Sequence, residues 1–203
     1  MRLIAFEGLD QSGKQTQAEL LRDRLVDGGR LVRLLSFPAY ETPIGVEIER
    51  ALRGAREYGP EVMQLLYIAN RYELKPTIER EHERGTVIIC DRYLASSIAY
   101  GEAQGLDAEW LQTIQTHLPQ PDVTVLLDIA PEVSARRKTT DRDKYERDLA
   151  LLGRVRDSYR RQAQANGWIV LDASRPKDAI ALDVQAAIER PQRLATRRIP
   201  SRD

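Results

Sequence analysis

A glycine-rich turn near the start of the chain most restricts how this sequence can fold. The segment FEGLDQSGKQTQ, residues 6–17, contains the spacing G-x-x-x-x-G-K from Gly8 to Lys14. A short apolar run, 2–6, precedes the turn and a helical pattern, 14–27, follows it. Glycines let backbone N–H groups turn inward around phosphate oxygens, and the start of a helix adds positive partial charge. Strand, turn and helix in this order predict a phosphate-binding loop whose lysine reaches the phosphates of a nucleotide.

Short apolar runs alternate with longer helical patterns along the rest of the chain. The expected strands are 2–6, 31–36, 86–90, 123–128 and 168–172. The expected helices are 14–27, 43–53, 60–83, 93–104, 107–117, 131–138, 145–165 and 176–189. Continuous runs of Val, Ile and Leu suit parallel strands that are covered on both faces. The alternation therefore predicts an α/β fold with an open parallel sheet.

Length and composition limit the number of domains and the class of partner. The chain has 203 residues, so we expect one domain over 1–189 and a basic, disordered tail over 190–203. Lys plus Arg and Asp plus Glu balance at 31 each, which favours neither nucleic acid nor an anionic membrane as a partner. The one cysteine, Cys90, permits no internal disulfide, and no apolar run is long enough to span a bilayer. We therefore expect a cytoplasmic protein.

The residue after the loop lysine departs from the usual pattern. Such loops carry a Ser or Thr there, whose hydroxyl binds Mg²⁺, but this chain has Gln15. The hydroxyl of Thr16 lies about 100° further round the helix and cannot simply replace it. We expect Mg²⁺ to be held mainly by phosphates, waters and carboxylates, with Asp10, Gln15 and Asp91 as candidate protein ligands. The expected nucleotide-binding residues of the loop are Gly8, Leu9, Asp10, Gln11, Ser12, Gly13, Lys14, Gln15 and Thr16.

A second candidate site follows another apolar strand, in the segment TVIICDRY, residues 86–93. Asp91 stands at the carboxyl end of that strand, where ligands bind in open α/β sheets. A strand that ends in Asp beside a phosphate loop has the form of a Walker B carboxylate, which holds Mg²⁺ or its water. Arg92 follows directly, and its planar guanidinium suits a phosphate. The two residues extend the predicted site to a metal and a second phosphate.

Four stretches, in chain order, resemble the thymidylate kinase family of the P-loop nucleoside monophosphate kinases. They are FEGLDQSGKQTQ, FPAY (37–40), DRYLASSIAY (91–100) and DRDKYERD (141–148). The resemblance covers residue 1 to about 189. It implies a three-layer P-loop NTPase fold: a five-stranded parallel sheet in the order 2-3-1-4-5, with helices on both faces and a mobile lid. It also implies ATP- and Mg²⁺-dependent phosphorylation of dTMP to dTDP in dTTP synthesis, by a homodimer.

The resemblance assigns a role to each matching residue. The implied catalytic residues are Lys14, Asp10, Asp91, Arg92 and Arg142. The implied dTMP-binding residues are Asp10, Phe37, Pro38, Tyr67, Arg71, Arg92, Ser96, Ser97, Tyr100, Asp143 and Tyr145. Arg92 would grip the acceptor phosphate, and Tyr100 would pack under the deoxyribose, where it crowds a ribose 2′-hydroxyl. Tyr67 and Arg71 are four residues apart and share a helix face, so the ring can stack on a pyrimidine while the guanidinium donates to a base carbonyl.

The segment RRKTTDRDKYERD resembles the mobile lid of the family, at about 136–148. A lid excludes water, which would otherwise accept the phosphoryl group. Some members carry a basic residue in the phosphate loop where this chain has Gln11, so the catalytic cation is expected from the lid. Arg142 is the first candidate, and Arg137 and Lys138 follow. Arg137 also matches the position that stacks on adenine in the family.

Two further departures concern the acceptor site. Neither Ala39 nor Tyr40 is the arginine that many members place after the FP pair, and Gly101 stands where many have Gln. Two other hypotheses therefore stay open at this point. The first is a kinase for another pyrimidine nucleotide or a deoxynucleoside. The second is a nucleotide-binding protein without catalysis, although the N-K-x-D motif of a GTPase is missing from the sequence.

Overall fold

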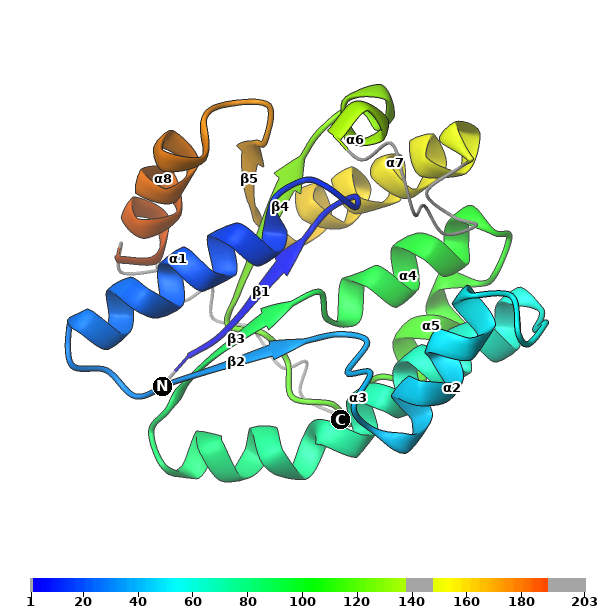
Figure 1. Ribbon diagram of the computed structural model, residues 1–203, viewed down its shortest axis with the longest axis horizontal. Coiled ribbons are helices and arrows are strands. Elements are labelled where there is room, and N and C mark those ends of the chain that lie inside the picture. The colour runs from blue at the N-terminus through cyan, green and yellow to red at the C-terminus, as the bar shows by residue number, and fades with distance from the viewer. Residues whose placement is uncertain (1, 138–147, 190–203) are drawn as a thin grey trace, which may run out of the picture.

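The computed structural model describes residues 2–137 and 148–189. Its strands form one parallel five-stranded sheet in the order β2-β3-β1-β4-β5 (Figure 1). The strands are β1 (Leu3–Glu7), β2 (Val32–Ser36), β3 (Val87–Asp91), β4 (Val123–Asp128) and β5 (Ile169–Asp172). The parallel sheet and its strand order confirm the predicted fold.

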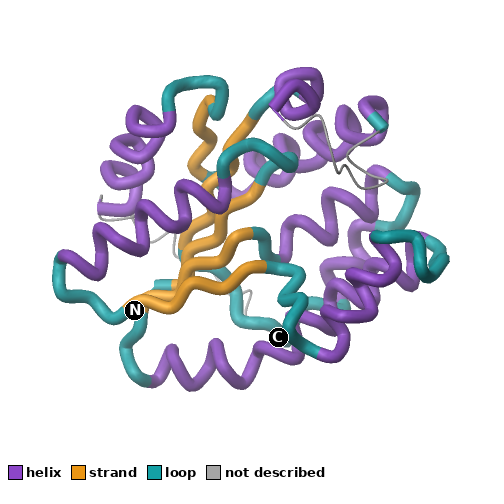
Figure 2. Tube along the Cα trace, in the orientation of Figure 1, coloured by secondary structure: helices purple, strands orange, loops and turns teal. Residues whose placement is uncertain are grey.

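Helices surround the sheet. They are α1 (Lys14–Asp27), α2 (Pro43–Leu52), α3 (Pro60–Glu83), α4 (Leu94–Ala103), α5 (Ala108–Thr113), α6 (Pro131–Arg137), α7 (Leu149–Asn166) and α8 (Lys177–Glu189). In Figure 2, α1 and α8 lie together on one side of the strands, while α3, α4 and α7 lie on the other. Among the described residues, no helix has the length and apolar character needed to cross a membrane.

The central strands are buried on both faces, which explains their continuous apolar sequences. Ile4 and Phe6 of β1 belong to one core cluster, whereas Leu3 and Ala5 belong to the other. Successive side chains of a strand point to opposite faces, so β1 and β3 each supply both clusters. The free thiol of Cys90, on β3, is buried in the second cluster, and this burial raises the pKa of the thiol.

Two helices differ from their expected bounds for local reasons. The helix expected over 107–117 ends at Thr113, because from Gln115 on the backbone N–H groups bond three residues back instead of four, as in Gln115 to Gln112. The helix expected over 145–165 begins at Leu149 in the described part of the chain, where the carboxylate of Asp148 accepts the backbone N–H of Leu151 at 2.9 Å. The side chain of Asp148 thereby caps a free donor of the first turn.

The direction of winding reverses beside β1, and this reversal places the site. The chain passes from β1 to β2 on one side, and from β3 past β1 to β4 on the other. Phe6 and Asp91 are partners in register, and the N–H of Arg92 bonds to the carbonyl of Phe6 at 2.9 Å. The loop after β1 and the segment after β3 therefore leave the sheet together, at the edge where open α/β sheets bind ligands.

Candidate active site

The loop after β1 has backbone angles that suit a phosphate cradle. Gly8, Gln11 and Gly13 have φ values of 140°, 60° and 91°. A Cβ atom on Gly8 would collide with the backbone carbonyl of Leu127 on β4, so only glycine fits there. The hydroxyl oxygen of Ser12 is buried and has no hydrogen-bond partner among the described residues. The unpaired hydroxyl of Ser12 and the backbone N–H groups of the turn are therefore available to bind an anion.

Lys14 begins α1 and is 5% exposed. Its ammonium group donates to the carbonyl of Leu9 at 2.8 Å, within the same loop. Burial, followed by the charge of Arg92, lowers the pKa of Lys14 to about 8, although nearby carboxylates oppose the change. The protein's own groups therefore stabilise the positive charge on this lysine only in part.

Asp10 joins the phosphate loop to the segment after β3. Its carboxylate forms an ion pair with Arg92 at 2.7 Å and accepts the hydroxyl of Tyr100 at 3.1 Å. Burial opposes the ionised form, but the charges of Arg92 and Lys14 and these hydrogen bonds outweigh it and hold the pKa of Asp10 well below its usual value. The guanidinium of Arg92 also lies 5.3 Å from the centre of the Tyr100 ring. Three residues with predicted roles thus form one connected group.

Arg92 is held from behind by Ser96, which we expected in the site, and by Glu7 and Tyr159, which the sequence analysis did not identify. Its φ is 62°, a left-handed conformation that is uncommon outside glycine. One nitrogen of its guanidinium donates to the hydroxyls of Ser96 and Tyr159, each at 3.2 Å. Glu7, which is fully buried, accepts Ser96 Oγ at 2.7 Å, the hydroxyl of Tyr159 at 3.2 Å and the N–H of Tyr93 at 2.9 Å.

Glu7 stands in the F-E-G-x-D stretch, so its position in that motif was a signal that could have been used. No local sequence signal marks Tyr159, because it comes from α7, far along the chain, and its partners are set by how α7 packs.

Asp91 ends β3, as expected, and is suited to a metal. One of its carboxylate oxygens is buried and has no hydrogen-bond partner among the described residues. In the described part of the chain, no three acidic, His or Cys side chains are grouped so that they could together hold a metal ion. An unpaired carboxylate oxygen in a sparse set of oxygen donors fits Mg²⁺, which keeps waters and substrate phosphates among its ligands.

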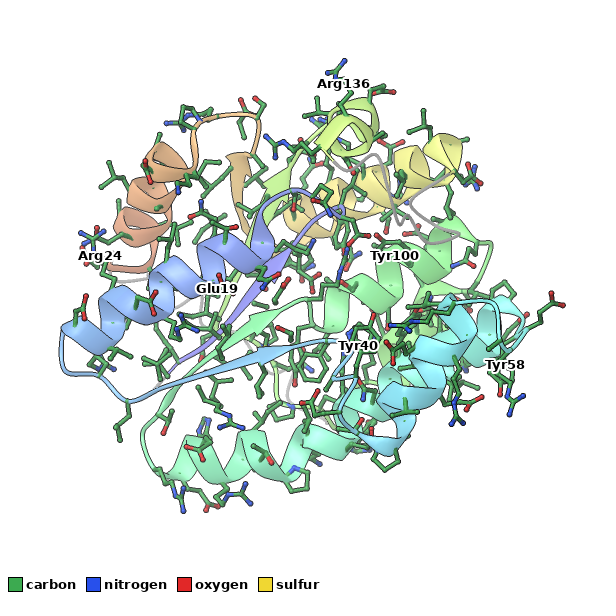
Figure 3. All side chains as sticks on the ribbon, viewed as in Figure 1. Glu19, Arg24, Tyr40, Tyr58, Tyr100 and Arg136 are labelled. Carbon is green, nitrogen blue, oxygen red and sulfur yellow. The ribbon has the colours of Figure 1, made fainter. Side chains whose placement is uncertain are left out.

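Gln15 and Thr16 are both exposed on the first turn of α1. The amide nitrogen of Gln15 donates to the carboxylate of Glu19 at 2.9 Å, one helical turn further on. Glu19 is labelled on α1 in Figure 3. This contact leaves the amide oxygen of Gln15 as its remaining group for a metal or one of its waters, so its role as a ligand stays a prediction.

A pocket lies next to Asp10, with an empty volume of about 570 Å³ that includes its open side. Figure 3 shows Tyr40 and Tyr100, two of its residues, in the same region beyond the end of β3. It is lined by Asp10, Phe37, Pro38, Tyr40, Leu52, Gln64, Tyr67, Arg71, Arg92, Ser96, Ser97 and Tyr100. The structure brings together every dTMP-binding residue that we expected in the described ranges. Tyr40, Leu52 and Gln64 also line the pocket, and we had assigned them no binding role.

Arg71 is built into the wall of this pocket. It is 3% exposed, and it donates to the hydroxyl of Ser97 at 2.8 Å and to the carbonyl of Tyr67 at 3.0 Å. Its guanidinium lies 5.8 Å from the centre of the Phe37 ring. Burial lowers the pKa of Arg71, and its Nε has no hydrogen-bond partner among the described residues. A buried, charged side chain with a donor to spare is suited to bind a carbonyl of a ligand.

The lid residues fall on both sides of the described boundary. Arg137 ends α6 and donates to the carbonyls of Gln11 at 3.0 Å and Ala173 at 2.8 Å, so it lies against the phosphate loop. Lys138, Arg142, Asp143 and Tyr145 lie outside the described residues, as does the tail over 190–203. The roles expected of these residues stay predictions.

The fold and the site define a P-loop nucleotide phosphotransferase, and comparisons with known proteins narrow the class. Residues 6–184 match the family model described as thymidylate kinase. The chain is 35% identical to the thymidylate kinase of Schizosaccharomyces pombe, with 85% of this chain and 84% of that protein covered. It is 39% identical to a probable thymidylate kinase of Pyrobaculum calidifontis, with 92% and 95% covered.

A solved structure agrees with these sequence matches. A thymidylate kinase from Candida albicans superposes with a TM-score of 0.83 at 30% identity, and the match covers 93% of this chain and 91% of that one. The chain belongs to the thymidylate kinase family. It is accordingly an enzyme of the nucleoside monophosphate kinase class.

Proposed function

We propose that the chain catalyses ATP + dTMP → ADP + dTDP, with the phosphate loop as the donor site and the pocket beside it as the acceptor site. One observation carries this proposal. Asp10 belongs to the phosphate loop and also bonds to Arg92 and Tyr100, which line the pocket. A donor phosphate in the loop and an acceptor phosphate at Arg92 would therefore lie close together, on either side of Asp10.

The chemistry requires placement and charge more than covalent participation. Phosphoryl transfer proceeds in line, and the transition state is stabilised by cations around the moving group. Lys14 would hold the donor phosphates and Arg92 the acceptor phosphate, while Asp10 fixes the direction of the Arg92 guanidinium. The acceptor oxygen is already anionic near neutral pH, so the site needs no strong general base. Arg142 of the expected lid would supply a third cation.

A bound Mg²⁺ would supply positive charge to the donor phosphates. Asp91, through its unpaired carboxylate oxygen, would hold the ion or its water, with Asp10 and Gln15 as further candidates. Arg137, whose guanidinium lies on the phosphate loop, would contact the adenine of ATP.

Selection of the acceptor would rest on the pocket walls. Tyr67 and Arg71 would bind the pyrimidine, and Ser97 would hold the Arg71 guanidinium in place. Phe37 and Pro38 would form the facing wall. Tyr100 is anchored to Asp10 by its hydroxyl, so its ring would lie under the sugar and crowd a ribose 2′-hydroxyl.

A panel of acceptors tests the proposal. The purified protein is given Mg·ATP with dTMP, dUMP, UMP, dCMP or thymidine, and the formation of ADP and of phosphorylated product is measured. We expect a strong preference for dTMP, with dTDP as the product. A preference for UMP would contradict the role of Tyr100, and ATP binding without turnover on any acceptor would contradict the proposed reaction.

We also propose that the protein acts as a homodimer in the cytoplasm, as implied by its family. Exposed apolar side chains on α2 and α3 support an interface there: Val46, Val62 and Leu65 are 38%, 42% and 45% exposed. The single buried thiol of Cys90 is in keeping with a reducing compartment.

A further inference from the structure

Gln64 lines the acceptor pocket, although nothing in the sequence pattern gave it a role. It lies on α3 three residues before Tyr67 and seven before Arg71. Residues at these spacings share one face of a helix, so the three side chains line the same wall. Gln64 has no exposed surface.

The carboxamide of Gln64 is unusual because neither of its polar atoms is satisfied. Both Nε2 and Oε1 are buried and have no hydrogen-bond partner among the described residues. An amide that leaves water without gaining a partner destabilises the folded protein, and most buried polar groups are therefore paired. A buried, unpaired polar group in the wall of a pocket therefore indicates that a ligand forms the missing hydrogen bonds.

The place of Gln64 depends on a glycine of α4. A Cβ atom on Gly101 would lie 3.3 Å from Cγ of Gln64 and 2.5 Å from Cδ1 of Leu111. The stem of Gln64 therefore packs against the bare backbone of α4, next to Tyr100. The absence of a side chain at position 101 gives the glutamine room between α3 and α4.

Gln115, a buried glutamine outside the pocket, provides a comparison for the hydrogen bonding of Gln64. Gln115 is 2% exposed, but its Nε2 donates to the carbonyl of Leu111 at 3.0 Å, so only its oxygen is unpaired. It is not among the pocket residues. Gln64 thus differs in having both a free donor and a free acceptor, side by side, at the wall of a binding site.

We propose that the Gln64 carboxamide hydrogen-bonds to the pyrimidine base of the acceptor nucleotide and is a specificity-determining residue of the site. The imide edge of thymine presents an N–H donor beside carbonyl acceptors, which complements an amide that offers one donor and one acceptor. The base is the part of dTMP expected next to Tyr67 and Arg71, on the same helix face. This inference rests on the proposed function, because dTMP is taken as the acceptor.

The test compares two matched variants by dTMP binding in the absence of ATP. Gln64→Met keeps the length and volume of the side chain and removes both polar atoms. Gln115→Met makes the same change at a buried glutamine outside the pocket. Dissociation constants for dTMP and for 2-deoxyribose 5-phosphate, which lacks the base, are measured by calorimetry, and ligand-free melting temperatures are recorded.

We expect Gln64→Met to weaken dTMP binding about tenfold, as the loss of one or two hydrogen bonds would. Binding of 2-deoxyribose 5-phosphate should stay within twofold of the wild-type value, and the ligand-free melting temperature should hold or rise, because an unpaired buried amide has been removed. Gln115→Met should leave dTMP binding unchanged.

Two results would overturn the inference. If dTMP binding to Gln64→Met stayed within twofold of wild type, the amide would not contact the base. If both ligands weakened equally, or the ligand-free protein lost several degrees of melting temperature, Gln64 would act through packing. Turnover of the wild-type protein is assayed separately, so dTMP binding without transfer would refute the proposed reaction and leave the result on Gln64 intact.

Discussion

Lys14 is the residue at which burial and function conflict most directly. A buried ammonium group is favourable only when anions surround it, and the carboxylate of Asp10 near Lys14 is already paired with Arg92. The pKa of Lys14 consequently falls to about 8. The phosphates of ATP would provide the missing negative charge, so nucleotide binding and protonation of this lysine should be coupled.

We predict that ATP binding takes up about half a proton at pH 8, because about half of the free molecules carry a neutral Lys14 there and phosphate raises the pKa again. The affinity for ATP should therefore weaken as pH rises above about 8, where free Lys14 loses its charge. Proton uptake on binding should vanish near pH 6, where Lys14 is already charged. Calorimetry in two buffers with different ionisation enthalpies measures the proton. Lys14→Ala should abolish the uptake and lower turnover at least about a hundredfold.

Near-wild-type turnover of Lys14→Ala would remove this lysine from the mechanism. A wild-type protein that binds ATP without proton uptake at pH 8 would show that Lys14 is already fully charged before the nucleotide arrives.

At the scale of secondary-structure elements, α7 connects the carboxyl end of β4 to the acceptor site. Arg156 of α7 makes two hydrogen bonds to the carboxylate of Asp128, at the end of β4, at 2.7 and 2.9 Å. Bidentate pairing of this kind fixes orientation. One helical turn further along, Tyr159 places its hydroxyl against Arg92, Ser96 and Glu7. The position of the helix therefore sets the position of the proposed phosphate-binding guanidinium.

We predict that Tyr159→Phe lowers kcat/KM for dTMP several-fold and leaves the KM for ATP unchanged. The free energy of unfolding should fall by about 1 kcal/mol, because buried partners of the hydroxyl lose a hydrogen bond. Steady-state kinetics with each substrate and denaturant unfolding measure the two effects.

Tyr72→Phe is the matched control. Its hydroxyl donates to the carbonyl of Ile114 at 2.9 Å, and Tyr72 is not among the pocket residues. We expect Tyr72→Phe to lower the free energy of unfolding by a similar amount and to leave kcat/KM for dTMP unchanged. Equal kinetics for both variants would mean that Tyr159 does not position Arg92.

At the scale of the whole molecule, one sheet edge carries both substrate sites. The phosphate loop follows β1 and the proposed metal ligand ends β3, and both strands run to the same edge of the sheet (Figure 1). Residues of α2, α3 and α4 line the pocket beside that edge. Because α2 and α3 form one wall of the acceptor pocket, an interface on the outer faces of these helices would hold that wall in place. Assembly and acceptor binding would then be linked.

We predict that Leu65→Asp converts a dimer into a monomer, because a charge would be buried at the proposed interface. Leu182→Asp, on α8, is the control, since Leu182 is 62% exposed and α8 lies on the other side of the molecule from α2 and α3 (Figure 1). Light scattering coupled to size exclusion measures the molar mass over a range of concentrations. A wild-type monomer, or a dimer that persists in Leu65→Asp, would contradict an interface on these helices.

Much of the fold was predictable because it depends on local pattern. The apolar runs placed all the strands of the sheet within one residue of their observed bounds, as in β4, and Pro43 and Pro60 marked the first residues of two helices. The strand order came with the family resemblance, since pattern alone does not say which strands are neighbours. The end of α5 was missed because a change from four-residue to three-residue hydrogen bonding leaves little trace in composition.

The sequence by itself determined the phosphate loop, the strand that ends in Asp91 and the family, because each is a run of neighbouring residues with a fixed spacing. Only the tertiary structure decided that Glu7 and Tyr159 hold Arg92, that Lys14 has a lowered pKa, and that Gln64 lies unpaired in the acceptor pocket. These properties arise from contacts between distant segments and from exclusion of water. The spacing of residues along the chain predicts neither the contacts nor the exclusion of water, because both depend on how helices and strands pack around the same point.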